Sequence, residues 1–258
     1  MGDPTADADR AWRALLEAMR AFPALMAGGS WEEPGALAIA RSPECPVPIL
    51  NGVWTLGDTP VSAVSAAVES LEAEGLPAPV LVREGRSPSI ETAAPELGFV
   101  LEDRIPLMVS TPAELVTETI DGVELVEVTD DEGLDDARRV VEAGFGVPDG
   151  LLRPLYVPPL TDDPDFTTTL ARTIDGPVCT AQTMRRGDDV GIYSVATPDP
   201  HRGRGYGGAL TAWATAYSFA AGASFAYLQS SEMGVPVYRR IGFRQVDMCA
   251  VYTRPALS

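Results

Sequence analysis

The sequence contains no lysine, a single histidine and only three cysteines. Without lysine it cannot form the Gly-Lys-Ser/Thr motif of a P-loop nucleotide site. The cysteines, Cys45, Cys179 and Cys249, are odd in number and widely spaced, so they form neither a disulfide framework nor a zinc-binding spacing. Because His201 is the single histidine, we expect no metal site.

Long apolar runs are also missing. No segment reaches the ~20 apolar residues of a membrane span, and the acidic start, MGDPTADADR, has no apolar signal-peptide core. We therefore expect a cytoplasmic, reduced protein with no membrane partner. Basic charge is scarce: the sequence has 19 arginines and 37 acidic residues, which gives a net charge of −18. That balance argues against a nucleic-acid partner. It suits a cationic amine substrate, or serves solubility alone.

The most informative stretch present runs from residue 192 to residue 208. Its apolar start predicts a buried strand over Ile192–Thr197. A glycine-rich loop follows, and then a helix in which Leu210, Trp213 and Tyr217 lie at helical spacing on one apolar face. The stretch therefore predicts a strand, a loop and a helix in direct succession.

The loop carries the pattern R-x-x-G-x-G at Arg202, Gly205 and Gly207. Glycine permits positive φ and close approach of the backbone to a ligand. The free N–H groups at the start of a helix favour an anion. The loop therefore predicts a pyrophosphate cradle, with an ordinary glycine-rich turn as the alternative. It lacks the G-x-G-x-x-G spacing of a dinucleotide fingerprint.

Periodicity and turn residues predict alternating helices and strands on both sides of a linker expected at Thr111–Glu118. In the first half we expect helices at Arg10–Met26, Val61–Glu74 and Ile90–Leu97, and strands at Ala36–Ala40, Ile49–Leu56, Pro79–Arg83 and Val100–Val109. In the second half we expect helices at Asp131–Phe145, with Phe145 on its inward face, and at Met233–Arg240, beside the loop helix. We expect strands at 123–128, Phe166–Ile174, Pro177–Met184 and Ala223–Gln229, and a strand pair or one long strand at Phe243–Thr253.

A weak internal repeat relates the two halves. The order helix, glycine, strand, short helix, Gly-Phe, strand occurs twice, with the dipeptides at Gly98-Phe99 and Gly242-Phe243. In the first copy, Leu56–Pro60 stands where the second copy has the glycine-rich loop. The repeat predicts that the first half keeps the fold and has lost the ligand loop. Chance agreement of short signals is the alternative.

The loop and the later run Val237–Phe243 together resemble the GNAT superfamily of acetyl-CoA-dependent N-acetyltransferases. The central family motif matches Arg202 to Gly207, and the later motif Y-x-x-I-G-F matches Tyr238 to Phe243. The resemblance implies an α/β (α+β) fold with a mixed sheet, organised as two tandem GNAT-like halves. It implies a degenerate domain at residues 1–115 and an acetyltransferase domain at residues 120–258.

The resemblance also implies a binding site for acetyl-CoA as co-substrate, with no metal. The strand backbone at Val195, Ala196 and Thr197 would pair with the pantetheine arm. Arg202 would shape the loop or neutralise phosphate charge. The pyrophosphate would meet the N–H groups of the loop, which are those of Gly203, Arg204, Gly205, Tyr206, Gly207 and Gly208. Prolines at 198 and 200 cannot donate ladder hydrogen bonds, so we expect them to part this strand from its neighbour.

The implied reaction is direct transfer of an acetyl group to a primary amine, carried by a small molecule or a peptide. Tyr238 would protonate the leaving thiolate, with a packing role as the alternative. The general base stays open among Glu232, Glu142 and a water relay. A non-catalytic acyl-CoA sensor is the alternative function, and the sequence leaves a homodimer open.

Overall fold

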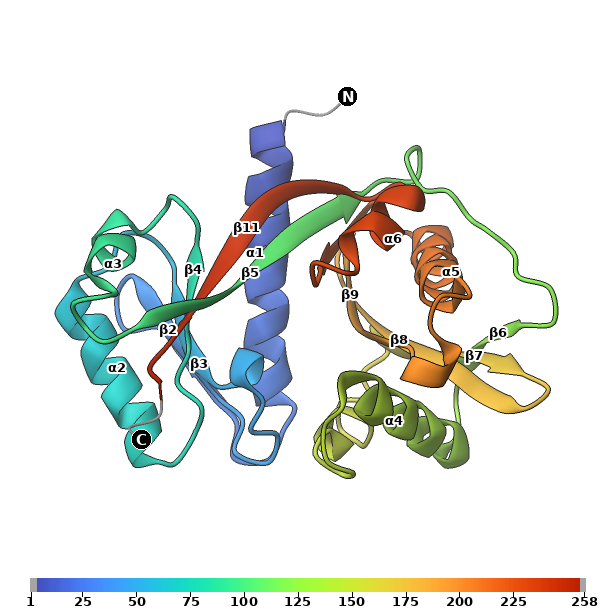
Figure 1. Ribbon diagram of the computed structural model, residues 1–258, viewed down its shortest axis with the longest axis horizontal. Coiled ribbons are helices and arrows are strands. Elements are labelled where there is room, and N and C mark those ends of the chain that lie inside the picture. The colour runs from blue at the N-terminus through green and yellow to red at the C-terminus, as the bar shows by residue number, and fades with distance from the viewer. Residues whose placement is uncertain (1–3, 256–258) are drawn as a thin grey trace. The chain divides into compact units, whose positions relative to one another are not determined.

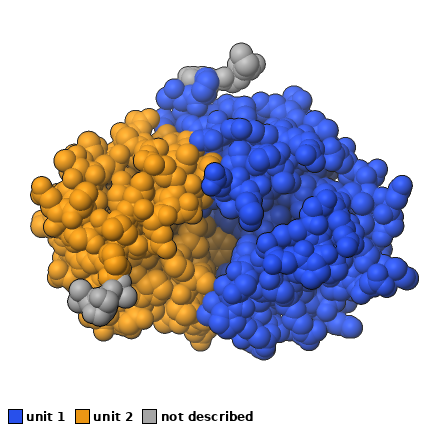
Figure 2. All heavy atoms as spheres, in the orientation of Figure 1, with its two compact units in different colours: residues 1–18, 107–246 blue, residues 19–106, 247–258 orange. Residues whose placement is uncertain are grey.

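The computed structural model describes residues 4–255, which form two compact units (Figures 1 and 2). Unit 1 contains the chain up to Ala18 together with Leu107–Val246. Unit 2 contains Met19–Pro106 together with the chain from Asp247 onward. The units are thus assembled from interleaved segments, and the chain-order division into residues 1–115 and 120–258 stays a prediction.

Unit 1 is a mixed sheet with one parallel strand pair, β9 with β10, among antiparallel neighbours. Its helices are α4 (Asp131–Phe145), α5 (Tyr206–Ala220) and α6 (Val235–Arg240). In sheet order its strands are β6 (Glu124–Val128), β7 (Phe166–Thr173), β8 (Gly176–Arg186), β9 (Asp189–Ala196), β10 (Phe225–Gln229) and the end of β5 (Val100–Ser110).

Unit 2 repeats this plan on a smaller scale. Its parallel pair is β3 with β4, joined through α2 (Val61–Ala73), just as α5 joins β9 to β10. The short helix α3 (Pro88–Ala93) follows β4, and the long helix α1 (Pro4–Ala24) begins in unit 1 and ends in unit 2. In sheet order its strands are β1 (Ser30–Glu32), β2 (Leu37–Arg41), β3 (Gly52–Thr55), β4 (Val80–Arg83) and the end of β11 (Arg244–Thr253).

The last strand of each sequence repeat pairs with one strand of the other repeat's parallel pair. Strand β5 ends the first copy, yet its residues Leu107–Ser110 pair antiparallel with β10 of the second copy. Strand β11 ends the second copy, yet its residues Cys249–Tyr252 pair antiparallel with β4 of the first copy. Each half of the chain therefore completes its sheet with a strand from the other half.

Most expected elements are confirmed, and the exceptions have local causes. Helix α4 has the expected bounds, and the β7–β8 hairpin turns at Gly176 with a φ of +119°. Proline at position 48 starts a 3₁₀ turn, Pro48–Leu50, so β3 begins only at Gly52. The three-residue strand β1 was not expected, because it is too short to show a period.

Two aromatic residues expected on buried helix faces are exposed. Phe145 of α4 is 53% exposed, and Tyr217 of α5 is 48% exposed. The buried face of α5 consists mainly of small residues such as Ala209 and Ala212, with Tyr206 and Leu210 as its large members near the start of the helix. Because small residues let the helix lie close to the sheet, Tyr217 is left outside, where it stacks on Trp213 at 5.6 Å.

The strand exchange predicts that neither half of the chain folds alone. A fragment of residues 120–258 lacks β5, so the apolar strand β10 is left as an open sheet edge, which favours aggregation. We expect this fragment to elute as aggregate and to show no cooperative thermal transition by circular dichroism. Co-expression with residues 1–115 should restore a single species that melts like the full chain. A monomeric fragment with a cooperative transition would contradict the pairing.

Candidate functional site

The candidate site lies where the two parallel strands of unit 1 stop pairing. Strands β9 and β10 are in register from Phe225 opposite Asp189 to Leu228 opposite Ile192. Strand β9 continues to Ala196, whereas β10 ends at Gln229. The last residues of β9 therefore have no ladder partner on the β10 side. This is the stretch for which the family resemblance implies pairing with a pantetheine arm.

The parting of these strands comes with a β-bulge in β9. The register with β8 passes from Tyr193 opposite Gln182 to Ala196 opposite Thr180, so β9 has one residue more than β8 over this interval. Ser194 lies in the bulge with a φ of +53°, the one positive φ of a non-glycine residue among the described residues. The expectation that proline at 198 and 200 parts the strands is therefore wrong. Pairing with β10 ends several residues before either proline.

The glycine-rich loop has the backbone geometry that its sequence predicts. Gly203 and Gly205 have φ values of +76° and +84°, which only glycine adopts at little cost. Gly205 is the N-cap of α5, and the N–H of Ala209 is the first to reach an acceptor in the helix, the Gly205 carbonyl at 3.0 Å. The preceding amides of the first turn have no intrahelical acceptor. Amides without an acceptor at a helix N-terminus favour an anion.

Two glycines of α5 keep its first turn close to its neighbours. A Cβ at Gly207 would lie 3.5 Å from Oγ1 of Thr197, the residue directly after β9. A Cβ at Gly208 would lie 3.2 Å from Cγ1 of Val237 in α6. A side chain at position 207 would thus enter the space beside the end of β9. The backbone here fits a ligand that lies along β9 and reaches the helix terminus.

Arg202 holds the loop in place. Its Nε donates to the carbonyl of Thr197 at 2.9 Å, and its Nη2 donates to the carbonyl of Gly144 in α4 at 2.7 Å. Its Nη1 also pairs with Asp199 at 2.5 Å. Of the two expected roles, these contacts support shaping the loop, because every guanidinium nitrogen already has a protein partner.

The other residues expected at the loop take different positions. Tyr206 is buried and packs in a cluster with Leu210, so only its backbone can face a ligand. Arg204 is exposed and makes no hydrogen bond or ion pair within residues 4–255. Val195 is partly buried, and Ala196 packs against Gly144, where a Cβ would lie 2.8 Å away.

Tyr238 lies in α6, and its ring is packed while its hydroxyl has no partner. The ring contacts Phe243 edge-on, at 6.2 Å between centroids. Within the described part of the chain no hydrogen bond involves its hydroxyl. Burial, and to a smaller degree the nearby thiol of Cys179, raise the pKa of Tyr238 above its usual value of 10. The phenol therefore keeps its proton at neutral pH, as an acid requires.

The two carboxylates considered as general bases lie in different environments. Glu142 is buried and accepts three hydrogen bonds, from Arg138 Nη1 at 2.5 Å and from the backbone of Gly150 and Leu152 at 3.0 and 2.8 Å. These bonds tie α4 to the segment after it and leave Glu142 with a structural role. Glu232 is exposed in the turn after β10. It and a water relay remain candidates.

One residue near the site was missed from the sequence. Tyr156 lies in the proline-rich segment between α4 and β7, and it is 3% exposed. Its hydroxyl lies close to Ser194 of the bulge and Thr180, but it is not in hydrogen-bond geometry with either. Burial raises the pKa of this phenol above its usual value. The ring also lines a pocket of about 750 Å³ beside α4.

The described residues hold no cluster of histidine, cysteine, aspartate and glutamate suited to a metal ion. Among residues 4–255, no helix is both long and apolar enough to cross a membrane.

Comparison with solved structures identifies the fold. A structure described as a GCN5-related N-acetyltransferase from Kribbella flavida matches with a TM-score of 0.74 and 22% identity, over 97% of this chain and 96% of that chain. A second, from Sphaerobacter thermophilus, matches with a TM-score of 0.65 and 18% identity, over 88% and 84% of the two chains. No protein-family model and no curated protein matches the sequence.

A third similar structure is a tandem GNAT protein from the clavulanic acid biosynthesis pathway. It matches with a TM-score of 0.56 and 12% identity, over 84% of this chain and 77% of that chain. The protein therefore has the GNAT fold, and the expected mixed α/β architecture is confirmed. At these identities the likeness establishes the fold alone.

The unpartnered hydroxyl of Tyr156 predicts an unusual response to mutation. Because a buried hydroxyl without a hydrogen bond costs about 1–3 kcal/mol, Tyr156→Phe should leave the free energy of unfolding unchanged or raise it. Tyr227→Phe is the control, since the Tyr227 hydroxyl donates to the Ala14 carbonyl at 2.9 Å and bonds Tyr193 at 2.6 Å. It should destabilise the protein by about 1–3 kcal/mol. Urea unfolding measures both, and equal losses would show that Tyr156 is bonded in solution.

Proposed function

We propose that this protein transfers an acetyl group from acetyl-CoA to a primary amine by direct attack within a ternary complex. The observation that supports this most is the meeting of an unpaired strand end with a glycine-lined helix N-terminus. Ser194 and Val195 have no ladder partner on either side, and the first turn of α5 begins at Gly205 close by. The GNAT fold supports the same class of reaction.

The residues present fit both the pyrophosphate and the pantetheine arm of acetyl-CoA. Gly203 and Gly205 turn the loop so that the amides before Ala209 can receive a pyrophosphate. The backbone of β9 from Val195 onward can pair with the amide groups of the pantetheine arm, as an added strand would. When bound, acetyl-CoA supplies the activated acetyl group and the thiolate leaving group.

Each step of the transfer needs a group that this chain can supply. The attacking amine must lose a proton, to water or to Glu232. The backbone N–H of Val195, in the stretch of β9 without a ladder partner, can donate to the carbonyl oxygen that gains negative charge. The raised pKa of Tyr238 keeps its hydroxyl protonated, so it can donate a proton to the departing sulfur.

Unit 2 has the same strand–helix–strand frame but a different connection. Asp58 of the β3–α2 segment accepts both the N–H and the hydroxyl of Ser89, at 3.0 and 2.9 Å. Pro60 is the N-cap of α2. A carboxylate therefore lies where a phosphate would have to approach, and we propose that acetyl-CoA binds only once per chain, in unit 1.

Cofactor binding is tested by calorimetry with acetyl-CoA. The wild type should bind with a stoichiometry of one, and Gly205→Glu should abolish binding, since a side chain and a negative charge then face the pyrophosphate. Gly205→Asp and Gly205→Asn form a matched pair, because both residues tolerate positive φ and differ in charge. The aspartate should weaken binding more. Gly57→Glu, in the corresponding segment of unit 2, should change nothing. Two sites per chain, or unchanged affinity of Gly205→Glu, would contradict the assignment.

The role of Tyr238 is tested by Tyr238→Phe, which keeps the ring contact with Phe243. We expect kcat and kcat/KM to fall together by about 10²-fold or more, while acetyl-CoA affinity holds. Because its pKa is raised, wild-type activity should show no loss from tyrosine ionisation between pH 7 and about pH 10. The measurement is thiol release with a panel of amines and peptide N-termini. Wild-type turnover of the variant would leave Tyr238 a packing role. Cofactor binding without acetylation of any amine would favour the sensor.

A further inference from the structure

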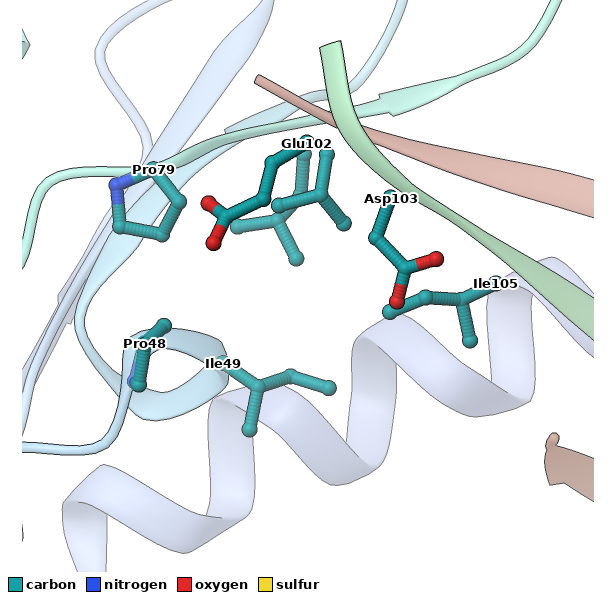
Figure 3. A pocket seen from close by; sticks show the side chains of 8 residues that line it. Pro48, Ile49, Pro79, Glu102, Asp103 and Ile105 are labelled. Carbon is teal, nitrogen blue, oxygen red and sulfur yellow. The ribbon is translucent and has the colours of Figure 1, made fainter. Parts of the chain in front are cut away.

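Unit 2 contains a pocket that the proposed reaction does not use. It has a volume of about 410 Å³ and lies beside β4 and β11 (Figure 3). Two of its lining residues are acidic and the others are apolar. They are Pro48, Ile49, Pro79, Leu81, Glu102, Asp103, Ile105 and Val251.

The floor of this pocket is an apolar patch of the sheet. Leu81 of β4 and Val251 of β11 are register partners, so their side chains lie side by side. Side chains alternate along a strand, and Val80 and Val82 belong to the core under α2. Leu81 and Val251 therefore face the opposite side of the sheet. Both are buried, at 1% and 9% exposure, which fixes the floor in position.

Two carboxylates stand over this floor without a counter-ion from the protein. Glu102 makes no hydrogen bond or ion pair within residues 4–255, and Asp103 accepts only the backbone N–H of Arg104, at 2.7 Å. Arginines on the neighbouring strand positions are paired with other carboxylates. Arg104 pairs with Glu84 at 2.8 Å, and Arg83 pairs with Asp247 at 2.6 Å. Both side chains line the pocket and are labelled in Figure 3.

An apolar floor beneath two unpaired negative charges is complementary to a cation with an apolar body. The volume suits one aromatic ring or branched alkyl group with its charged head. We propose that this pocket binds an organic ammonium ion, with its apolar group against Leu81 and Val251 and its nitrogen beside Glu102 and Asp103. This second amine-binding site lies in the unit that lacks the glycine-rich loop, so it goes beyond the proposed acetyl transfer.

Benzyltrimethylammonium is a suitable probe, because it has no N–H and cannot be acetylated. Its binding to the full chain, measured by calorimetry, is therefore independent of the proposed reaction. We expect saturable binding to the wild type. The double variant Glu102→Gln, Asp103→Asn should bind about fivefold more weakly or worse, from the loss of two partly solvated ion pairs. The control variant Glu69→Gln, Glu96→Gln removes the same charge from exposed positions of unit 2 and should bind as the wild type does.

Two further probes separate the parts of the ligand. Tetramethylammonium keeps the charge without the ring, benzyl alcohol keeps the ring without the charge, and each should bind more weakly than benzyltrimethylammonium. Ile49→Trp should also weaken binding by filling the pocket while both carboxylates remain. The proposal is overturned if the wild type does not bind, if the Glu102 and Asp103 variant binds normally, or if the control variant loses as much affinity. Acetyl-CoA binding plays no part in these measurements, so the two proposals fail separately.

Discussion

The candidate site depends on one constraint, the end of hydrogen bonding between β9 and β10. Pairing stops at Ile192 and Leu228, and the bulge at Ser194 follows directly. A non-glycine residue at positive φ costs of order 1–3 kcal/mol unless its surroundings enforce it. The residues directly after the bulge are held by contacts from several elements. The backbone of Gly144 in α4 packs against Ala196. Arg202 ties the loop to α4 and to Thr197, the residue directly after β9. Contacts from α4 and from the glycine-rich loop thus fix the end of β9 in a position where it does not pair with β10.

The parts of this structure that the sequence predicts are those with local signals. Helix α4 shows a full amphipathic period and an Asp130 cap that accepts the N–H of Gly133, so its bounds are readable. The β7–β8 hairpin is marked by Asp175-Gly176, and the loop before α5 by its glycine spacing. In each case a few neighbouring residues determine the backbone, and no distant partner is needed to specify it.

The parts that the sequence does not predict depend on contacts between distant segments. Nothing in the sequence around Ser194 indicates a bulge, because the extra residue can be recognised only from the pairing of β9 with β8. Tyr156 lies in a proline-rich segment without a period, and only the fold brings it near Ser194. The role of Glu142 likewise becomes clear from the backbone amides that surround it. Periodicity placed Phe145 and Tyr217 inside, and both are exposed. For Tyr217, periodicity cannot show that small residues of α5 already fill the helix–sheet contact.

The strand exchange between the two halves also bears on the order in which the chain can fold as it is synthesised. Domains made first commonly fold first, while the rest of the chain is still being made. Here β4 pairs with residues Cys249–Tyr252, which are synthesised after all the other described strands. The half that is synthesised first is therefore the half whose sheet is completed last. In unit 1, by contrast, the strand contributed by the first half, β5, is synthesised before its partner β10.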